Sequence, residues 1–371
     1  MATTPKLFTP LTLGGKKNPL QLQHRIAMAP MTRMRSGEAG VPPQYTAEYY
    51  AQRATPGGLL ITEATNILPT ARGYFGTPGI FSQDQIDAWK PVTKAVHDKG
   101  GVIFLQLWHT GRLSHPLNQP DNALPVSSSS NMPIDENRTV ATREGPLALV
   151  RPRALEIHEI QPICDAYRQA AVNAIAAGFD GVELHAANGY LLEQFLHDGI
   201  NDRTDEYGGS VENRARFFFE ALDAILTSVD ANKVGVRLSP YNITCHQRDS
   251  DPATTYKYVF DKLNNYDLAY VSLVEPRAPH YPNELAPQEG VSAFFRKIYS
   301  GVLITASSYD RTNALATVEA GHADIVAIGR YFISNPDLVE RFKLDAALSP
   351  WNEETWYTAG VVGLTDYPFL K

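Results

Sequence analysis

Short apolar runs alternate with longer amphipathic stretches along most of the chain. The apolar runs lack the strict apolar–polar alternation of a half-exposed sheet, so we expect strands that are buried on both faces. The predicted strands are Arg25–Ala29, Leu59–Thr62, Val102–Leu107, Gly181–His185, Val234–Leu238, Leu268–Leu273, Val302–Thr305 and Ile325–Ile328.

Helical stretches separate most of these strands. They are Asp84–Lys99, His158–Ala177, Val211–Ser228, Thr254–Asn264, Val291–Ile298, Arg311–Ala320 and Asp337–Phe342. Gly100 and Gly178 follow two of them and predict left-handed caps. Eight strand–helix units without an intervening linker favour an α/β fold made of one (β/α)₈ barrel over residues 1–371, rather than a doubly wound sheet with a second domain.

Two segments fall outside this repeat. Leu7–Leu22, with Gly14 and Gly15 at its centre, predicts a β-hairpin before the first strand that can close the bottom of the barrel. The segment 110–152 is rich in Pro, Ser and Asn and has no helical period. It is longer than an ordinary connection, so it is either disordered or a lid over the carboxyl-terminal face, where barrels carry their active sites.

Composition narrows the class of protein. The 371 residues are 43% hydrophobic and 20% charged, and the net charge is −7. This predicts a globular protein without the basic surface that nucleic acid or an anionic membrane requires. Cys164 and Cys245 are too few for a disulfide framework. With no signal peptide or membrane-spanning stretch in the sequence, we expect a cytoplasmic protein that acts as a monomer or homodimer on a small molecule.

Polar residues follow the predicted strands and should converge on one mouth. The set comprises Thr32, Glu63, Gln106, His109, His185, Asn188, Tyr190, Arg237, Ser307, Ser308 and Arg330. It has no clustered His and carboxylate pattern, so we predict no metal site. The set is a ring of hydrogen-bonding groups instead.

His185, Asn188 and Tyr190 follow the fourth strand together. A single His there is more often a structural residue. An imidazole, an amide and a phenol in one small volume can instead bind a carbonyl oxygen, stabilise enolate-like charge and deliver a proton.

Other mouth residues leave two interpretations open. Gly329 and Arg330 form either an ordinary surface turn or a phosphate site after the last strand. Arg237 points inward from a buried strand with no acidic residue beside it on that strand, so we expect an anionic or electron-rich ligand. Gln106 suits the pyrimidine edge of a flavin, but it also suits an ordinary core. No Gly-x-Gly-x-x-Gly or Walker motif occurs, which argues against a separate nucleotide domain.

Several sequence blocks, in order, resemble the Old Yellow Enzyme family of FMN-dependent ene-reductases, and within it the plant 12-oxophytodienoate reductases. The blocks are Ala29–Arg33, Gln52–Gly58, Gln106–His109 with Gly111 and Arg112, Gly178–Glu183 leading into His185, Asn201–Ser210, Ile333–Leu338 and Thr365–Pro368. They span nearly the whole chain.

The resemblance implies non-covalent FMN at the mouth of a barrel, with NADPH or NADH as reductant. It implies a flavin site made by Pro30, Met31, Thr32, Ala64, Gln106 and Arg237, with the phosphate held by Ser307, Ser308, Gly329 and Arg330. It implies that His185 and Asn188 bind the substrate carbonyl, that Tyr190 donates the proton, and that Trp108, Tyr74 and Tyr357 border the substrate.

The implied reaction is reduction of the activated C=C bond of an α,β-unsaturated ketone or aldehyde, for example an oxylipin such as 12-oxophytodienoate, in two half-reactions at one site. The chain departs from the family at two places. Plant members have a second His where Asn188 stands, and the family commonly has Gly-Gly where Ser307 and Ser308 stand. If that turn needs positive φ, each Ser costs about 1 kcal/mol. Two alternatives are a flavin-free barrel lyase or isomerase acting on a phosphorylated carbonyl compound, and a non-catalytic flavin-binding redox sensor.

Overall fold

The computed structural model describes residues 4–14, 19–130, 138–243, 248–276 and 283–370, and within these ranges eight parallel strands close into a barrel. The strands are β3 (Ile26–Met28), β4 (Leu59–Ile61), β6 (Val102–Trp108), β11 (Gly181–Ala186), β12 (Val234–Leu238), β13 (Tyr270–Val274), β14 (Leu303–Ala306) and β15 (Ile325–Ile328). They pair in this order, and β15 returns to β3. The short strand β5 (Thr65–Asn66) adds to β6.

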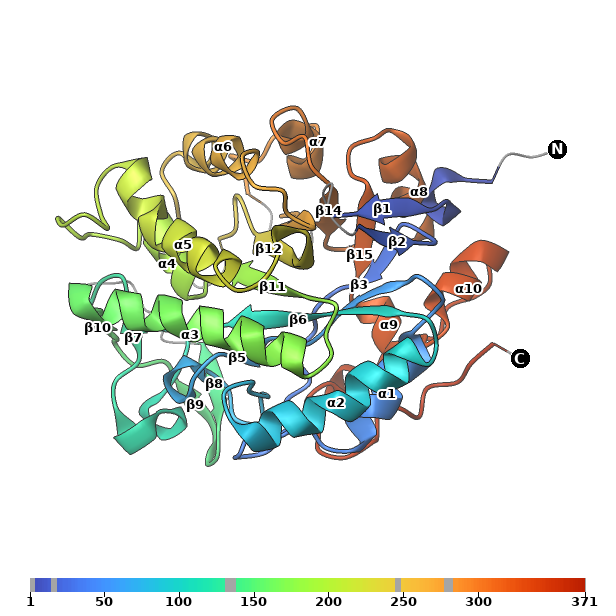
Figure 1. Ribbon diagram of the computed structural model, residues 1–371, viewed down its shortest axis with the longest axis horizontal. Helices are drawn as coiled ribbons and strands as arrows, with labels where there is room; N and C mark the ends of the chain where they lie inside the picture. Colours follow the sequence, from blue (N-terminus) through green and yellow to red (C-terminus); the bar gives the residue numbers. More distant parts are fainter. Residues whose placement is uncertain (1–3, 15–18, 131–137, 244–247, 277–282, 371) are drawn as a thin grey trace.

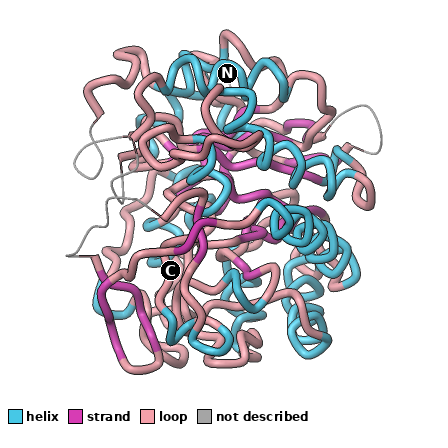
Figure 2. The backbone as a smooth tube through the Cα atoms, turned by 90° about the vertical axis from the view of Figure 1, so that its left-hand side faces the viewer, coloured by secondary structure: helices cyan, strands magenta, loops and turns pink. Residues whose placement is uncertain are grey.

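Helices surround the strands (Figures 1 and 2). They are α1 (Tyr45–Arg53), α2 (Gln83–His97), α3 (Ile157–Ala176), α4 (Leu191–Leu196), α5 (Val211–Leu226), α6 (Pro252–Leu263), α7 (Val291–Arg296), α8 (Arg311–Glu319), α9 (Arg330–Ser334) and α10 (Leu338–Leu344). In Figure 1, α2, α3 and α5 run along the outside of the barrel. The fold confirms the predicted (β/α)₈ architecture.

Most predicted elements begin and end within a few residues of the observed ones. β12 and β15 match their predicted ranges, and every residue of both strands is buried, as expected for strands covered on each face. Gly100 and Gly178 have φ of 72° and 92°, so both predicted left-handed caps are present. Helices α1, α4 and α9 were not predicted.

The predicted N-terminal hairpin is present as β1 (Leu11–Leu13) paired antiparallel with β2 (Leu20–Leu22). The side chains of Leu13 and Leu22 are buried against inward-facing barrel residues, including Phe104 and Ile304. The hairpin therefore closes the amino-terminal end of the barrel. Gly15, at the predicted turn, lies outside the described residues.

The segment after β6 is folded over most of its length. It contains the 3₁₀ turns Pro116–Asn118 and Pro120–Asn122, the strands β7 (Val126–Ser127) and β10 (Arg153–Ala154), which pair with each other, and the hairpin β8 (Thr139–Thr142) with β9 (Gly145–Ala148). Where described, the segment is ordered structure, so the disordered alternative is wrong there. Residues 131–137 lie outside the described ranges.

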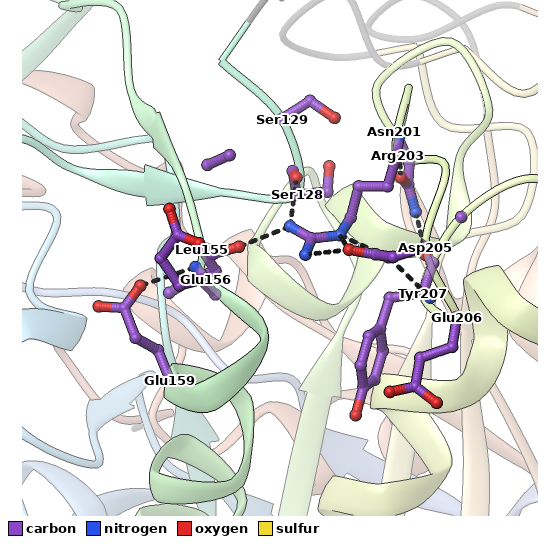
Figure 3. A network of polar contacts seen from close by, with 12 residues as sticks. Ser128, Ser129, Leu155, Glu156, Glu159, Asn201, Arg203, Asp205, Glu206 and Tyr207 are labelled. Carbon is purple, nitrogen blue, oxygen red and sulfur yellow. Dashed lines mark hydrogen bonds and ion pairs between the residues drawn. The ribbon is translucent and has the colours of Figure 1, made fainter.

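One arginine after α4 links the middle of this insertion to the chain just after its end (Figure 3). Arg203 Nη1 donates to the carbonyl oxygens of Ser128 at 3.0 Å and Leu155 at 2.6 Å. Its Nε donates to the Asp205 carboxylate at 3.0 Å. This gives the Asn201–Ser210 block a structural role, because it fixes the insertion against the loop that follows α4.

No helix in the described ranges is long and apolar enough to cross a membrane. Cys164 is a buried free thiol on α3, and Cys245 lies outside the described residues.

Candidate active site

A cavity of about 550 Å³ opens at the carboxyl-terminal ends of the barrel strands. It collects seven of the predicted cofactor residues, which come from the ends of β3, β12, β14 and β15: Pro30, Met31, Arg237, Ser307, Ser308, Gly329 and Arg330. Parallel strands bring their carboxyl ends together, which explains why residues so distant in sequence meet here.

Arg237 has a buried acidic neighbour that the sequence did not reveal. Glu183, on the neighbouring strand β11, interacts electrostatically with the guanidinium. As expected, no acidic residue stands on β12 itself, and the acidic neighbour comes from the next strand. Arg237 pairs in register with His185, and Glu183 lies two residues earlier on the same inner face. Arg237 Nη1 also donates to Ser272 Oγ at 3.3 Å.

The guanidinium keeps one donor for a ligand. Among the described residues, Arg237 Nε is buried without a hydrogen-bond partner, and Arg237 lines the cavity. Burial lowers the pKa of Arg237, and the charge of Glu183 acts in the opposite direction. A cationic donor directed at the cavity suits an electron-rich or anionic ring edge.

The turn after β14 adopts the backbone that its sequence disfavours. Ser307 has φ of 104° and Ser308 has φ of 51°, both in the region that favours glycine. The turn does need positive φ, so each serine costs about 1 kcal/mol here. Neither hydroxyl donates a hydrogen bond to another described residue, and both residues line the cavity.

Arg330 lines the same cavity as the two serines. It follows β15 and Gly329, and its guanidinium carbon is 5.9 Å from the centre of the Trp356 ring. Together with the paired serines, it presents one cationic group and two hydroxyls, which matches the needs of a phosphate.

A second cavity of about 270 Å³ adjoins the first at Val274 and Ser307. Asn188 and Tyr190 line it, together with Arg138 from the insertion. The insertion therefore contributes to the mouth, which agrees with the lid alternative.

His185 and Tyr190 form an aromatic cluster with Trp108. The ring centres of His185 and Tyr190 are 5.0 Å apart, and those of Trp108 and Tyr190 are 4.9 Å apart. Tyr74 stacks on the other side of Trp108 at 5.7 Å. The structure thus brings together four of the residues predicted to bind or border the substrate.

His185 is held as a neutral imidazole. Burial and then the charge of Arg237 lower its pKa well below the ordinary value. Its Nδ1 is buried with no partner among the described residues. A neutral imidazole can donate one hydrogen bond to a carbonyl oxygen without adding a full charge to the pocket.

Three other predicted residues lie where the strands place them. Thr32 follows β3, and the next residue donates its backbone N–H to Glu63 Oε2 at 2.8 Å, which fixes this segment. Burial raises the pKa of Glu63 to about 7. Ala64 follows β4 and is buried, and Gln106 Nε2 donates to Glu183 Oε1 at 2.7 Å. The amide nitrogen of Gln106 is therefore held by a protein group.

Tyr357 stands apart from the cluster. It is 55% exposed, and its ring centre is 6.4 Å from that of Trp356. The structure places it at the surface next to Trp356, and no ring contact with Trp108 is seen among the described residues.

Sequence reasoning missed several residues of the mouth. Tyr309, Tyr331 and Trp351 line the larger cavity, and the rings of Tyr331 and Trp351 are 5.1 Å apart. Trp351 lies in an irregular segment after α10, with no strand to place it. Glu193 on α4 was also missed, although the polar pair Glu193 and Gln194 inside a short run of leucines and a phenylalanine is a visible signal.

The residues present fit FMN. One end of the larger cavity has hydroxyl and guanidinium groups that suit a phosphate. At Arg237 a buried N–H without a partner among the described residues can donate to a ring edge. Among the described residues, no group of three or more His, Cys, Asp or Glu side chains is arranged to hold a metal ion.

Comparisons with known proteins agree with this geometry. The NADH:flavin oxidoreductase / NADH oxidase family model matches residues 6–348. The chain is 48% identical to 12-oxophytodienoate reductase 1 of Oryza sativa subsp. japonica, over 98% of this chain and 93% of the relative. It is 42% identical to 12-oxophytodienoate reductase 2 of Arabidopsis thaliana, over 99% and 97% of the two chains.

Solved structures give the same result. Morphinone reductase superposes with a TM-score of 0.93 at 46% identity, covering 99% of this chain and 97% of that chain. Its complex with tetrahydroNAD superposes with a TM-score of 0.91 at 46% identity, covering 99% and 98%. Neither the flavin-free lyase nor the redox sensor is favoured by these likenesses. The chain belongs to the NADH:flavin oxidoreductase / NADH oxidase family, that of the Old Yellow Enzymes, and is an FMN-dependent ene-reductase that uses NAD(P)H.

Proposed function

We propose that the smaller cavity binds an α,β-unsaturated ketone or aldehyde, with His185 and Asn188 donating hydrogen bonds to its carbonyl oxygen. The observation that carries this proposal is the packing of a neutral His185 against Tyr190, with ring centres 5.0 Å apart, beside a cavity that Asn188 also lines. Two neutral donors at one oxygen stabilise the negative charge that develops there as the C=C bond is reduced.

Tyr190 is the proposed proton donor. Its ring packs edge-on against both the imidazole of His185 and the indole of Trp108, and these two contacts fix its position. Once the β-carbon has received a hydride, the α-carbon needs a proton, and a positioned phenol supplies it. Trp108 and Tyr74 provide an apolar wall for the rest of the substrate.

The larger cavity is the proposed FMN site. Of the residues that line this cavity, Ser307, Ser308, Gly329 and Arg330 are proposed to hold the phosphate, and Pro30 and Met31 to contact the ring. The resemblance adds Thr32, Ala64 and Gln106 to the proposed ring contacts. Arg237 faces the ring edge with its unpartnered Nε. Bound FMN supplies the hydride acceptor and donor that the side chains lack.

The finer identity of substrate and reductant is also a proposal. The names 12-oxophytodienoate reductase and morphinone reductase both include an oxo compound, which supports a cyclic enone of that kind as substrate. We propose that NADPH, as well as NADH, reduces the enzyme at the same mouth.

The cellular compartment and the oligomeric state are further proposals. We propose a cytoplasmic enzyme, because the chain has 2 cysteines and the described one is a buried free thiol. We further propose that the barrel, hairpin and insertion work as one FMN-binding domain, present as a monomer or homodimer. Cell fractionation and sedimentation test these points.

The test of the proposed function is spectroscopic and direct. Purified protein is expected to be yellow, to bleach anaerobically with NADPH, and to regain its colour on addition of cyclohexenone. Protein that is colourless and takes up no FMN contradicts the proposal. Protein that bleaches but is not reoxidised by any enone contradicts the assigned substrate class.

A further inference from the structure

The loop that carries the proposed substrate-binding groups has an unusual backbone. Asn188 has φ of 56° and Gly189 has φ of 91°, so two successive residues adopt left-handed conformations directly before Tyr190. Asn and Gly tolerate this region better than other residues do, but the loop still needs partners for its backbone groups.

Both backbone amides lead to one carboxylate, that of Glu193 on α4. Gly189 N–H donates to Glu193 Oε2 at 2.7 Å. Asn188 N–H donates to Ser239 Oγ at 2.7 Å, and the Ser239 hydroxyl donates to Glu193 Oε1. The Tyr256 hydroxyl, on α6, donates to the same oxygen at 2.8 Å.

The burial of Glu193 demands an explanation. Its side chain has no exposed surface, and the neighbouring Leu191, Leu192 and Phe195 are equally buried. An apolar residue would fill such a position without the cost of removing a carboxylate from water. Burial raises the pKa of Glu193, and His197 and the three donors act against this rise. What Glu193 supplies here, and a leucine would not, is a pair of oxygens that accept hydrogen bonds.

The hydrogen bonds to Glu193 all need an acceptor at this position. The Ser239 hydroxyl accepts from Asn188 N–H and donates to Glu193, so it relays the contact between the loop backbone and the glutamate. A glutamine at this position keeps one accepting oxygen and presents an amide donor in place of the other. It therefore satisfies part of the network, whereas a leucine satisfies none of it.

We propose that Glu193 is a positioning residue for ene reduction: by fixing the backbone of Asn188 and Gly189 it aims the Asn188 amide and the Tyr190 phenol at the substrate. This inference rests on the proposed roles of Asn188 and Tyr190. Glu193 touches neither substrate nor cofactor, so its effect passes through these two residues.

The test uses the FMN-loaded enzyme in four double-mutant cycles. Glu193→Leu and the near-isosteric Glu193→Gln are each made alone, with Tyr190→Phe, and with Asn188→Ala. The rate of reoxidation by cyclohexenone is measured in single turnovers, and the dissociation constant of a simple phenol is measured from the change in flavin absorbance. Phenol binding reports the geometry of the pocket independently of turnover.

A matched control lies on α5. Glu220 Oε2 accepts from the Tyr207 hydroxyl at 3.0 Å, a carboxylate–phenol contact away from the residues of the site. Glu220→Gln removes the charge in the same way, and we expect it to leave enone reduction and phenol binding unchanged.

In the wild-type background, Glu193→Leu should slow reoxidation by about a hundredfold, the scale of a misplacement of about 1 Å. It should weaken phenol binding about tenfold, and Glu193→Gln should give smaller losses of both kinds. In the Tyr190→Phe background, the Glu193 variants should cause almost no further loss of rate, because the phenol being positioned is gone. In the Asn188→Ala background, they should cause almost no further loss of phenol affinity, because the amide being positioned is gone.

Losses of the same factor in every background would overturn the proposal, because they indicate a general effect on the fold. An unchanged rate and affinity in Glu193→Gln and Glu193→Leu would overturn it as well. If Tyr190→Phe alone leaves reoxidation unchanged, the proposed role of Tyr190 fails, and the phenol cycle with Asn188 still decides about Glu193.

Discussion

The two sides of the mouth contain the same backbone feature but support it differently. At the end of β11, the left-handed pair is Asn188 and Gly189, and both backbone amides are anchored through buried side chains. At the end of β14, the left-handed pair is Ser307 and Ser308, whose hydroxyls have no hydrogen bond to another described residue.

The loop after β11 is held by contacts within the protein, whereas the turn after β14 offers groups that a ligand can bind. The substrate side is preorganised, because its donors are held before any substrate arrives. The proposed phosphate side holds strain of about 1 kcal/mol at each serine, and its two hydroxyls are open to a bound phosphate. We therefore expect mutations on the substrate side to change chemistry and mutations on the phosphate side to change stability.

The largest expected effect concerns Tyr190. Tyr190→Phe removes the phenolic proton, and a positioned general acid contributes about 10²–10⁴ in rate, so reoxidation by cyclohexenone should slow by that factor. Bleaching by NADPH should remain near the wild-type rate, because that step needs no proton from Tyr190. Stopped-flow absorbance measures both steps, and equal losses in the two would show that another group is the donor.

A smaller effect is expected when one carbonyl donor is removed. His185→Ala or Asn188→Ala should each weaken phenol binding by about 10–100-fold, because a hydrogen bond to a charged oxygen contributes about 1.5–3 kcal/mol. Spectral titration of the FMN-loaded enzyme gives the dissociation constants. Unchanged affinity in both variants would place the phenol, and the substrate carbonyl, elsewhere.

On the phosphate side, Ser307→Gly should raise the free energy of unfolding of the flavin-free protein by about 1 kcal/mol. The φ of 104° at Ser307 strains a serine but not a glycine, and this gain exceeds the extra chain entropy of glycine. Ser228→Gly, at a residue without positive φ, serves as the control and should destabilise slightly. Urea unfolding measures both, and a destabilised Ser307→Gly would remove the strain from the comparison.

The smallest expected effect is a lack of pH dependence. The pKa of His185 is lowered well below its ordinary value of 6.5, so the imidazole stays neutral from about pH 8 down through pH 6. Single-turnover reoxidation should then show no inflection near pH 6.5. Because the unfolded chain binds a proton at His185 that the folded chain does not, stability should fall as the pH drops below this value. An inflection near pH 6.5 that disappears in His185→Ala would show a charged imidazole in the pocket.

The barrel could be predicted because most of its strands are continuous apolar runs in the sequence. β12 and β15 have no polar alternation to confuse their limits, apart from the inward Arg237. Helix α1 was missed because its buried face consists of Thr46, Tyr49, Tyr50 and Arg53 rather than aliphatic residues. Arg53 can be buried because it donates hydrogen bonds to backbone carbonyls such as that of Phe332, at 2.7 Å. No sequence period reveals such partners.

The site was predictable where function follows a strand end and unpredictable where it crosses between elements. His185, Arg237 and Ser307 follow from strand positions alone. Glu183 beside Arg237 depends on the register of β11 against β12, and Glu193 beneath Asn188 depends on how α4 docks. Single-sequence patterns carry neither piece of information, and the resemblance to a known family supplied the residues that we propose to hold the cofactor.

The most direct measurement is a crystal structure of the FMN-loaded enzyme with a simple phenol bound. The account predicts an isoalloxazine in the larger cavity beside Arg237, its phosphate at Ser307 and Arg330, and the phenol oxygen within hydrogen-bonding distance of His185 and Asn188. A flavin bound outside this cavity, or a phenol oxygen in contact with neither residue, would contradict it.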